Sequence, residues 1–345
     1  FDGMVDVRVI SNKERVNSAR VRPLSYKITP DCVGDTVTFS LSRPRNLSVE
    51  VNGDIFHNLH LFANPIDKFR PSDKEIQRAL KKKKGSNLIY FGPGVHNLPN
   101  DTLFVPSGTT VYIDGGARVY GNIFTEGAHD VNIFGRGEVH PDGRGAGVWV
   151  RRSKNVRIDG IVVSQLPIGQ CDSVELTNVK SISYYGWGDG MDVFSSSNVI
   201  LDGVFCRNSD DCAAVYASTQ GFKGGSNNVL VKNATLWADV AHPINIGGHG
   251  DPNGMDTVQN VTFRNIDILD QAEKQIDYQG CLAINPGDNT LVRNITFENI
   301  RIEDFRNGQL VIFRISFNPK YCVSTGRGIQ NAVSYTHLRA HETVL

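Results

Sequence analysis

The chain has 345 residues, 40% of them hydrophobic, and its 36 Lys and Arg residues balance its 36 Asp and Glu residues. This balance gives no basic field for nucleic acid or a membrane surface, and no run of 18 apolar residues predicts a membrane span. The six cysteines form no CxxC pair, so they indicate neither a zinc site nor a thioredoxin-like centre. Their even number allows disulfides, and the redox compartment stays open.

Residues 1–70 contain short β-rich runs between turn signals, including SYKIT, DTVTFSLS and LSVEVNG. Such runs predict a small antiparallel β-sandwich as the N-terminal domain. The sequence starts FDGMVDV, with neither an initiator Met nor a signal peptide. We expect the natural N-terminus to lie outside it and to carry the signal of a secreted or periplasmic protein.

Residues 71–86 predict a single helix, which acts as a cap or linker ahead of a long β region. Ser72 and Glu75 form a capping-box pattern, Ile76 and Leu80 mark one apolar face, and Gly85 is a typical residue at which a helix stops. A short helix at this point is suited to covering an exposed sheet end.

Residues 87–332 repeat one strand-and-turn phrase, as DVNIFGRG, NVRIDGIV, SVELTNVK, NVILDGVF, NVLVKNAT, NVTFRNID and NITFENIR. Its second residues lie at positions 131, 156, 174, 199, 229, 261 and 295, in steps of 25, 18, 25, 30, 32 and 34 residues. Repeats of this period predict a solenoid. Because each unit is all strand, with Asn or Gly at the bends, we predict an all-β fold, a right-handed parallel β-helix. A leucine-rich repeat is disfavoured, since its LxxLxL consensus is missing.

The last residues, VSYTHLRAHETVL (333–345), resemble a translated sequencing adapter. We expect this tail to be artefactual and infer no metal site from His337 and His341. The native protein is expected to continue differently beyond residue 332.

Two adjacent carboxylates, Asp210 and Asp211, stand at the start of the apolar run CAAVY. Aligning the repeat coil on coil matches the segments GDGMDVFSS, DDCAAVYAS and AHPINIGG. The alignment puts Asp189 one coil before Asp211 and His242 one coil after it, at steps of 22 and 31 residues. Because stacked coils are about 4.8 Å apart, these four side chains are predicted to form one cluster.

Closely spaced carboxyls cannot all ionise easily, so at least one retains a proton. One protonated and one ionised carboxyl are what glycosidic bond hydrolysis requires, and in inverting enzymes they stand roughly 6.5–9.5 Å apart to admit a water. The cluster therefore predicts a glycoside hydrolase site. Two alternatives stay open: aspartates that only cap coil turns, and a carboxylate calcium site.

At these residues the chain resembles the polygalacturonase family, glycoside hydrolase family 28, and its relative, the dextranase and isopullulanase family 49. WGDG is similar to the polygalacturonase NTDG, NSDDCAAV is similar to GDDCIAI, and YFGPGVHNLPNDTLFVPSGTTVYIDGGARVYG is similar to the opening of the β-helix in these enzymes. The resemblance covers most of residues 88–321 and implies a pectin-lyase-like solenoid, while the preceding sandwich favours family 49. It also implies that Asp210 is the general acid and that Asp189 and Asp211 activate the water.

Polygalacturonases also carry a histidine in the motif GHG-I-x-I-G. A text match points to His249 in GHG, whereas the coil alignment points to His242 in AHPINIGG. Strand alternation continues from His242 through Ile244 and Ile246, as it does after Asp211, so we predict His242 as the histidine of the cluster. His249 is then expected in a loop at the rim of the cleft.

One departure from the polygalacturonase pattern concerns the substrate. The RIK motif, whose Arg and Lys hold the galacturonate carboxylate, is replaced by CLAIN on the matching coil, and the similar FRIS lies one coil further along. This weakens the expectation of an acidic sugar and leaves neutral glucans open. The predicted substrate-binding residues are Trp187, Asn245, His249, Arg314, Asp277 and Tyr278.

We therefore predict an inverting polysaccharide hydrolase, polygalacturonase-like or dextranase-like, that acts as a monomer without metal or cofactor. Its expected partner is a polysaccharide or oligosaccharide, with no nucleic acid and no membrane. A calcium-dependent polysaccharide lyase is the first alternative, disfavoured by the scarcity of Lys and Arg beside the acids. A non-catalytic carbohydrate-binding β-helix is the second. The sugar, its linkage and endo or exo action are not indicated.

Overall fold

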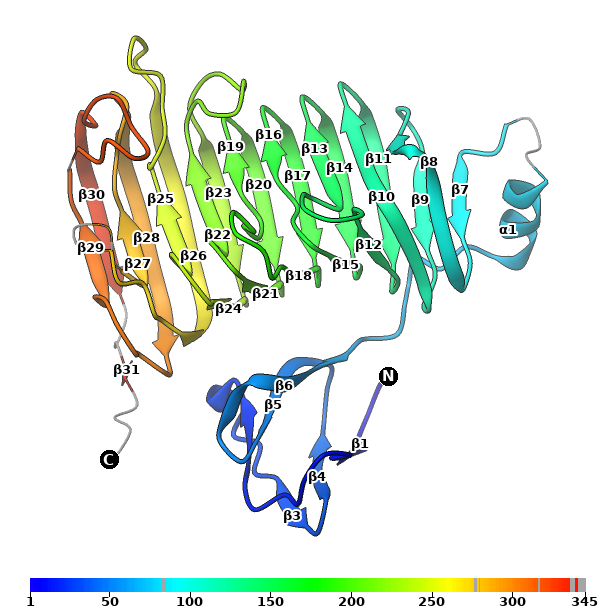
Figure 1. Cartoon of the computed structure of the whole chain (residues 1–345). Coiled ribbons are helices and arrows are strands. Elements are labelled where there is room, and N and C mark those ends of the chain that lie inside the picture. The colour runs from blue at the N-terminus through cyan, green and yellow to red at the C-terminus, as the bar shows by residue number, and fades with distance from the viewer. Residues whose placement is uncertain (82–84, 276–277, 279, 316, 336–338, 341–345) are drawn as a thin grey trace. The chain divides into compact units, whose positions relative to one another are not determined.

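The computed structural model describes residues 1–81, 85–275, 278, 280–315, 317–335 and 339–340 (Figure 1). The chain divides into two compact units, Phe1–Lys68 and Phe69–Leu345. No helix in the described part is long and apolar enough to cross a membrane. The domain boundaries predicted near residues 70, 86 and 332 stay predictions.

The first unit contains two antiparallel three-stranded sheets. One sheet has the order β1-β4-β3 and the other β2-β5-β6. Their strands are β1 (Val5–Ile10), β2 (Ala19–Arg22), β3 (Asp31–Val33), β4 (Thr36–Leu41), β5 (Arg45–Val51) and β6 (Asp54–Ala63), with a 3-10 turn at Leu24–Tyr26. Val37 and Phe39 of β4 share one buried cluster with Leu47 and Val49 of β5. Since both sheets contribute to this core, the unit is the predicted small β-sandwich.

The second unit begins with helix α1 (Asp73–Leu80). The Ser72 hydroxyl accepts a hydrogen bond from the backbone N–H of Glu75, and the Glu75 carboxylate accepts one from the N–H of Ser72. This is the predicted capping box. The stop expected at Gly85 is wrong, because Lys81 already leaves the helical conformation and its N–H bonds back to Ala79 and Gln77.

Parallel strands stack into three ladders along the second unit (Figure 1). The first, called the site ladder below, contains β8 (Gly94–Phe104), β10 (Ala117–Glu126), β13 (Val148–Arg151), β16 (Ile168–Gly169), β19 (Val193–Phe194), β22 (Ala213–Tyr216), β25 (Ile244–Ile246), β27 (Leu282–Ile284) and β29 (Val311–Phe313). The second contains β7 (Leu88–Phe91), β9 (Thr110–Ile113), β11 (His129–Gly135), β14 (Lys154–Asp159), β17 (Asp172–Thr177), β20 (Ser197–Asp202), β23 (Asn227–Lys232), β26 (Thr257–Asp270), β28 (Leu291–Ile302) and β30 (Gly328–Tyr335). The third begins with β8 and β10, continues through β12 (Glu138–His140), β15 (Val162–Val163), β18 (Lys180–Ile182), β21 (Phe205–Asn208) and β24 (Thr235–Ala238), and ends with β26, β28 and β31 (Arg339–Ala340).

The register of the second ladder follows the repeat in the sequence. The second residues of the repeated phrase pair in one unbroken column, Val131, Val156, Val174, Val199, Val229, Val261 and Ile295. Each of these side chains is at most 1% exposed, and burying a side chain of this size contributes about 1.5–3 kcal/mol. The predicted right-handed parallel β-helix is confirmed.

Within each of these strands, the polar residue just before the buried column residue takes the left-handed conformation. Asn198, Asn228, Asn260 and Asn294 all have positive φ, which Asn tolerates better than most residues. The Asn228 amide donates to Asn198 Oδ1 at 2.7 Å, and the Asn294 amide donates to Asn260 Oδ1 at 3.0 Å. These bonds join one coil to the next and fix the register that the apolar column favours.

The last coil continues past the boundary predicted at residue 332. Strand β30 extends through Tyr335, with Val333 paired to Thr296 of β28. The artefactual origin of the tail stays a prediction, and His337 and His341 lie outside the described residues. All six cysteines are free thiols, and five of them are buried.

Candidate active site

The site ladder brings three of the predicted catalytic residues into line. Its register steps by 22 residues from β19 to β22 and by 31 residues from β22 to β25, so Asp189, Asp211 and His242 occupy one position on three successive coils. Asp210 lies beside Asp211 in the turn that leads into β22. This is the stacking that the sequence predicts, while the catalytic roles stay a proposal.

Two glycines allow Asp189 to lie directly against the next coil. A Cβ on Gly190 would stand 2.2 Å from the carbonyl oxygen of Cys212, and one on Gly188 would stand 2.4 Å from Ser209 Oγ. The N–H of Gly190 donates to the carbonyl oxygen of Asp211 at 2.7 Å. The WGDG segment therefore needs both glycines for the backbone approach that brings the two aspartates together.

The Asp211 carboxylate accepts four hydrogen bonds. Its Oδ1 accepts from the backbone N–H of His242 at 2.9 Å and contacts His242 Nδ1 at 2.7 Å. Its Oδ2 accepts from the Tyr216 hydroxyl at 2.6 Å and from the Asn245 amide at 2.8 Å. Only 6% of Asp211 is exposed, so its charge is held in place by protein donors.

The three carboxyls of the cluster have different affinities for protons. Burial alone would raise the pKa of Asp211, but the charge and hydrogen bonds of His242, with those of Tyr216 and Asn245, hold it below its usual value. Burial and then the Asp211 charge raise the pKa of Asp210 to about 6. Burial, Asp211 and Asp210 raise the pKa of Asp189 to about 8. Asp211 is thus the ionised member, while Asp189 retains its proton at neutral pH and Asp210 retains its proton below about pH 6.

His242 is fully buried and carries a proton on both ring nitrogens. Its Nδ1 faces the Asp211 carboxylate, and its Nε2 faces the backbone carbonyl of Tyr278. Neither partner can donate, so both ring nitrogens act as donors. Burial lowers the pKa of His242, but the Asp211 carboxylate outweighs it and the net pKa is raised. His242 therefore acts as a fixed cation that keeps Asp211 ionised.

A fourth carboxyl, Asp192, lies behind this cluster. It is 3% exposed, and its Oδ1 has no hydrogen-bond partner among the described residues. Burial first, and then the charge of Asp189, raise its pKa well above the usual value. Asp192 is therefore a neutral carboxylic acid in the wall of the site.

Two predicted substrate-binding residues lie behind the carboxylates. Asn245 is fully buried and donates to Asp211, to the Tyr216 hydroxyl and to the Tyr278 hydroxyl. This burial favours a positioning role over the predicted contact with substrate. The half-buried His249 lies edge-on to the Tyr216 ring, with centroids 4.9 Å apart, and its burial lowers its pKa.

The other predicted substrate-binding residues differ in their surroundings. Trp187 is 65% exposed next to Asp189, while Tyr278 lies edge-on to the His242 ring at 4.7 Å. Arg314 is exposed one coil beyond the position that corresponds to the RIK motif, where its N–H donates to the carbonyl of Ile284. Asp277 lies outside the described residues.

The loop after β29 contributes two residues that sequence reasoning missed. The Tyr321 ring stacks on Tyr278 with centroids 5.0 Å apart, and the ammonium of Lys320 lies 4.7 Å from the centre of the Tyr321 ring. A hydrogen bond to Tyr321 raises the pKa of Lys320, and the charges of Glu273 and Asp210 raise it further. A cation therefore does lie near the acids. A scarcity of Lys and Arg beside them is no longer an argument against the calcium-dependent lyase.

No group of three or more His, Cys, Asp or Glu side chains is arranged to hold a metal ion within the part of the chain that the structure describes. The expectation that the reaction needs no metal stays a prediction, which a chelator tests.

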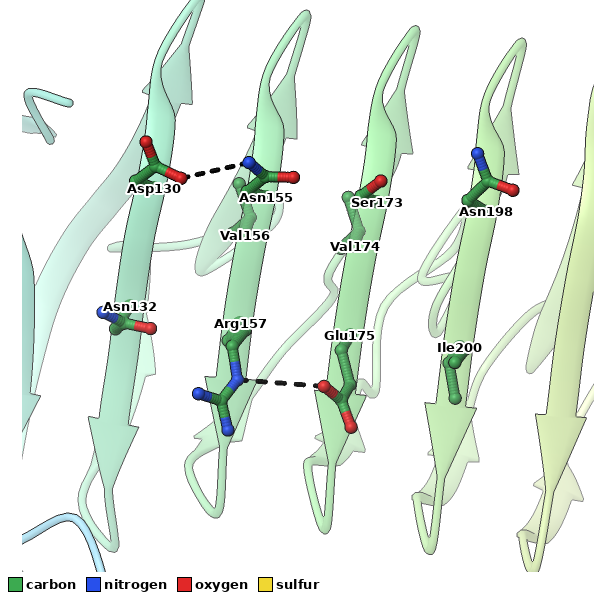
Figure 2. A pocket seen from close by; sticks show the side chains of 10 residues that line it. All are labelled: Asp130, Asn132, Asn155, Val156, Arg157, Ser173, Val174, Glu175, Asn198 and Ile200. Atoms are coloured by element: carbon green, nitrogen blue, oxygen red, sulfur yellow. Dashed lines mark hydrogen bonds and ion pairs between the residues drawn. The ribbon is translucent and has the colours of Figure 1, made fainter. Parts of the chain in front are cut away.

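A shallow hollow of about 540 Å³ lies on the second ladder, away from the predicted site residues (Figure 2). Its wall includes side chains of β11, β14, β17 and β20. The charged groups there are paired, Asp130 with the Asn155 amide at 3.0 Å and Arg157 with Glu175 at 3.8 Å. Because the charged groups of the hollow are bound to one another, they are poorly placed to act as an acid or a base. We therefore assign no catalytic role to the hollow.

Two solved structures have a similar fold. The family 28 exopolygalacturonase of Yersinia enterocolitica aligns with a TM-score of 0.59 at 12% identity, over 99% of this chain and 85% of that one. Dex49A from Penicillium minioluteum aligns with a TM-score of 0.52 at 14% identity, over 99% of this chain and 75% of that one. At these identities the likeness establishes the fold class, a β-helix of the polygalacturonase type.

The sequence itself identifies the family. Residues 142–338, more than half of the 345-residue chain, match the glycosyl hydrolases family 28, and the chain therefore belongs to that family. A polygalacturonase of Juniperus ashei is 27% identical over 280 residues, 71% of this chain and 50% of that protein. An exopolygalacturonase of Cochliobolus carbonum is 24% identical over 246 residues, 61% of this chain and 52% of that protein. The chain thus spans about half the length of these relatives.

Proposed function

We propose that this protein is an inverting polysaccharide hydrolase that is secreted or periplasmic. The observation that carries the proposal is the stacked cluster in which Asp211 is held ionised by His242, while the raised pKa of the neighbouring Asp210 lets it retain a proton below about pH 6. One acid and one anion at adjacent carboxyls are the minimal requirement for cleaving a glycosidic bond. The family supports the same reaction class.

In this proposal Asp210 donates its proton to the glycosidic oxygen as the bond to the anomeric carbon breaks. A water attacks that carbon from the opposite face and loses a proton to Asp211, the ionised carboxylate, while Asp189, which retains its own proton, can only orient that water. Asp210 loses one proton and Asp211 gains one, so transfer of that proton from Asp211 to Asp210 restores the starting state after product release. His242 and Asn245 are positioning residues, because they contact Asp211 and are shielded from solvent.

The reaction is tested by measuring the release of reducing sugar from polygalacturonate, rhamnogalacturonan, dextran, pullulan and algal galactans, each with and without EDTA. Release from one polymer that does not depend on EDTA is the expected result. Products that absorb in the ultraviolet and disappear with EDTA would instead indicate the calcium-dependent lyase. Binding of oligosaccharide without any release would indicate the non-catalytic β-helix.

Activity should fall as the pH rises through about 6. The general acid must be protonated, and burial with the Asp211 charge raises the pKa of Asp210 to about 6. The pH dependence of kcat/KM on the polymer identified above measures this limb. An alkaline limb that starts below pH 5 would mean that Asp210 is ionised in the free enzyme and cannot be the acid.

The first product formed should have the opposite anomeric configuration to the bond that was cut. An attacking water opposite the leaving group inverts the anomeric carbon in a single displacement. Proton NMR of the digest in its first minutes, before mutarotation, shows which anomer accumulates. Retention would require a covalent intermediate on one of the aspartates and would contradict the proposed mechanism.

A further inference from the structure

A row of aromatic side chains leads away from the buried histidine of the site. The Tyr278 ring lies against His242, and the Tyr321 ring stacks on Tyr278. Tyr278 precedes β27 and Tyr321 follows β29, so both come from coils beyond that of His242 toward the C-terminus. The space on this side of the cluster is therefore occupied by protein.

The row of aromatic side chains continues to Trp187, which lies on the coil of Asp189, on the N-terminal side of Asp211. The Trp187 ring, two residues before Asp189, lies edge-on to Tyr321 with centroids 6.4 Å apart. The Lys320 ammonium stands 5.9 Å from the centre of the Trp187 ring and 4.7 Å from that of Tyr321. The ammonium thus lies within cation–π distance of both rings, which favours their contact. We call this contact of Trp187, Lys320 and Tyr321 the bridge.

The loop that supplies two residues of the bridge is firmly attached. Cys322 Sγ donates to the carbonyl of Gly248 at 3.1 Å, and Asp288 Oδ1 accepts from the N–H groups of Val323 and Ser324 at 2.8 and 3.1 Å. These bonds tie the loop to the coils just beyond the acids. The bridge is thus part of the folded scaffold.

Trp187 itself is held in an unfavourable backbone conformation. Its φ is +62°, a region that bulky residues rarely adopt because it strains the backbone. The Gln165 amide donates to the Trp187 carbonyl at 2.9 Å and helps to hold it there. Strain of this kind persists where the surroundings impose a particular side-chain position, here one that reaches Tyr321.

We propose that the bridge closes the cleft on the C-terminal side of the acids, so that the enzyme attacks polymers from a chain end. This inference rests on the proposed function and specifies its mode of action. A polymer that crosses the acids in mid-chain would have to pass where Tyr278, Tyr321 and Trp187 meet. A chain end can enter beside Asp210 and stop against the bridge, and a short product leaves after each cut.

The test follows product size and viscosity on whichever polymer releases reducing sugar. The wild-type chain should give one short product from the earliest times, with little loss of viscosity. Trp187→Ala and Lys320→Ala should broaden the product sizes and increase the viscosity lost per bond cut several-fold. Tyr184→Ala is the matched control, because this 86% exposed aromatic lies on the same loop as Trp187. Random product sizes from the wild type would overturn the inference and leave the proposed function intact.

A binding measurement decides the inference without turnover. Oligogalacturonides and isomalto-oligosaccharides carrying a bulky fluorophore at either the reducing or the non-reducing end are titrated into the Asp210→Asn variant. If the cleft is closed, the Asp210→Asn variant fails to bind one of the two labelled forms. The double variant Asp210→Asn, Trp187→Ala is then expected to bind that form. Equal binding of both labelled forms would overturn closure. Absence of all binding, together with absence of cleavage on every polymer, would overturn the proposed function and closure with it.

Discussion

The Asp210→Asn variant is expected to lose about 10²–10⁴-fold in kcat on the polymer that the wild type cleaves. The amide keeps the size of the carboxyl but has no proton to give to the leaving oxygen. The measurement is the initial rate of reducing-sugar release at saturating substrate. Asp101→Asn is the matched control, because Asp101 is exposed and in the left-handed conformation, which Asn also tolerates.

A loss of less than about tenfold for Asp210→Asn would contradict its assignment as the acid, since positioned acids contribute far more. The same small loss in Asp211→Asn as well would remove the whole acid–base mechanism. The groups that cleave the polymer would then have to be sought outside this cluster.

Removing the imidazole of His242 should lower the free energy of unfolding of the second unit by about 3–5 kcal/mol. His242→Ala leaves Asp211 buried and charged without its cation, and it also removes a fully buried ring. Denaturant unfolding at pH 6 measures the change. His129→Ala is the control, because His129 and Asp130 form a similar pair at 2.8 Å that is exposed, and exposed pairs contribute about 0–1 kcal/mol.

The pH dependence of this loss has a defined sign. The raised pKa of His242 means that its contribution is present below the usual 6.5 and is lost as pH rises through the folded value. The lowered pKa of Asp211 means that its contribution is present above the usual 3.8 and is lost as pH falls through the folded value. The difference between wild type and variant should therefore be largest between these limits. A difference that is constant from pH 3 to 9 would indicate lost packing alone.

The β-helix and the alignment of the acids could be predicted because both follow from one repeating pattern. An inward Val or Ile recurs in every coil, and shifting a strand by one residue would turn that side chain outward. The register is therefore determined by the sequence even though the steps between coils range from 18 to 34 residues. Once the register is known, Asp211 and His242 must lie on neighbouring coils, whatever the length and conformation of the loop between them.

The parts of the site that lie outside the ladders could not be predicted in this way. Lys320 and Tyr321 lie more than 100 residues beyond Asp210, in a loop whose sequence has no periodicity. Their place depends on the thiol of Cys322 in the same loop, which donates to the Gly248 carbonyl, and on the Asp288 carboxylate, which accepts from the loop, and neither group belongs to the repeat. The burial of Asn245 could not be predicted for a related reason, because alternation gives the face of a strand but not the depth of burial at that face.

The column of buried valines and the left-handed asparagines have a consequence for how such a protein can change. Each coil is stabilised by the coil before it and the coil after it, so the effect of an insertion in one connecting segment ends with its neighbours. The connections can therefore vary in length and composition while the carboxyl groups keep their spacing. A new sugar preference could arise from exchange of loops such as the one carrying Lys320, without rebuilding the chemistry beneath it. In protein engineering, the β-helix is the constant part and the loops are the interchangeable part.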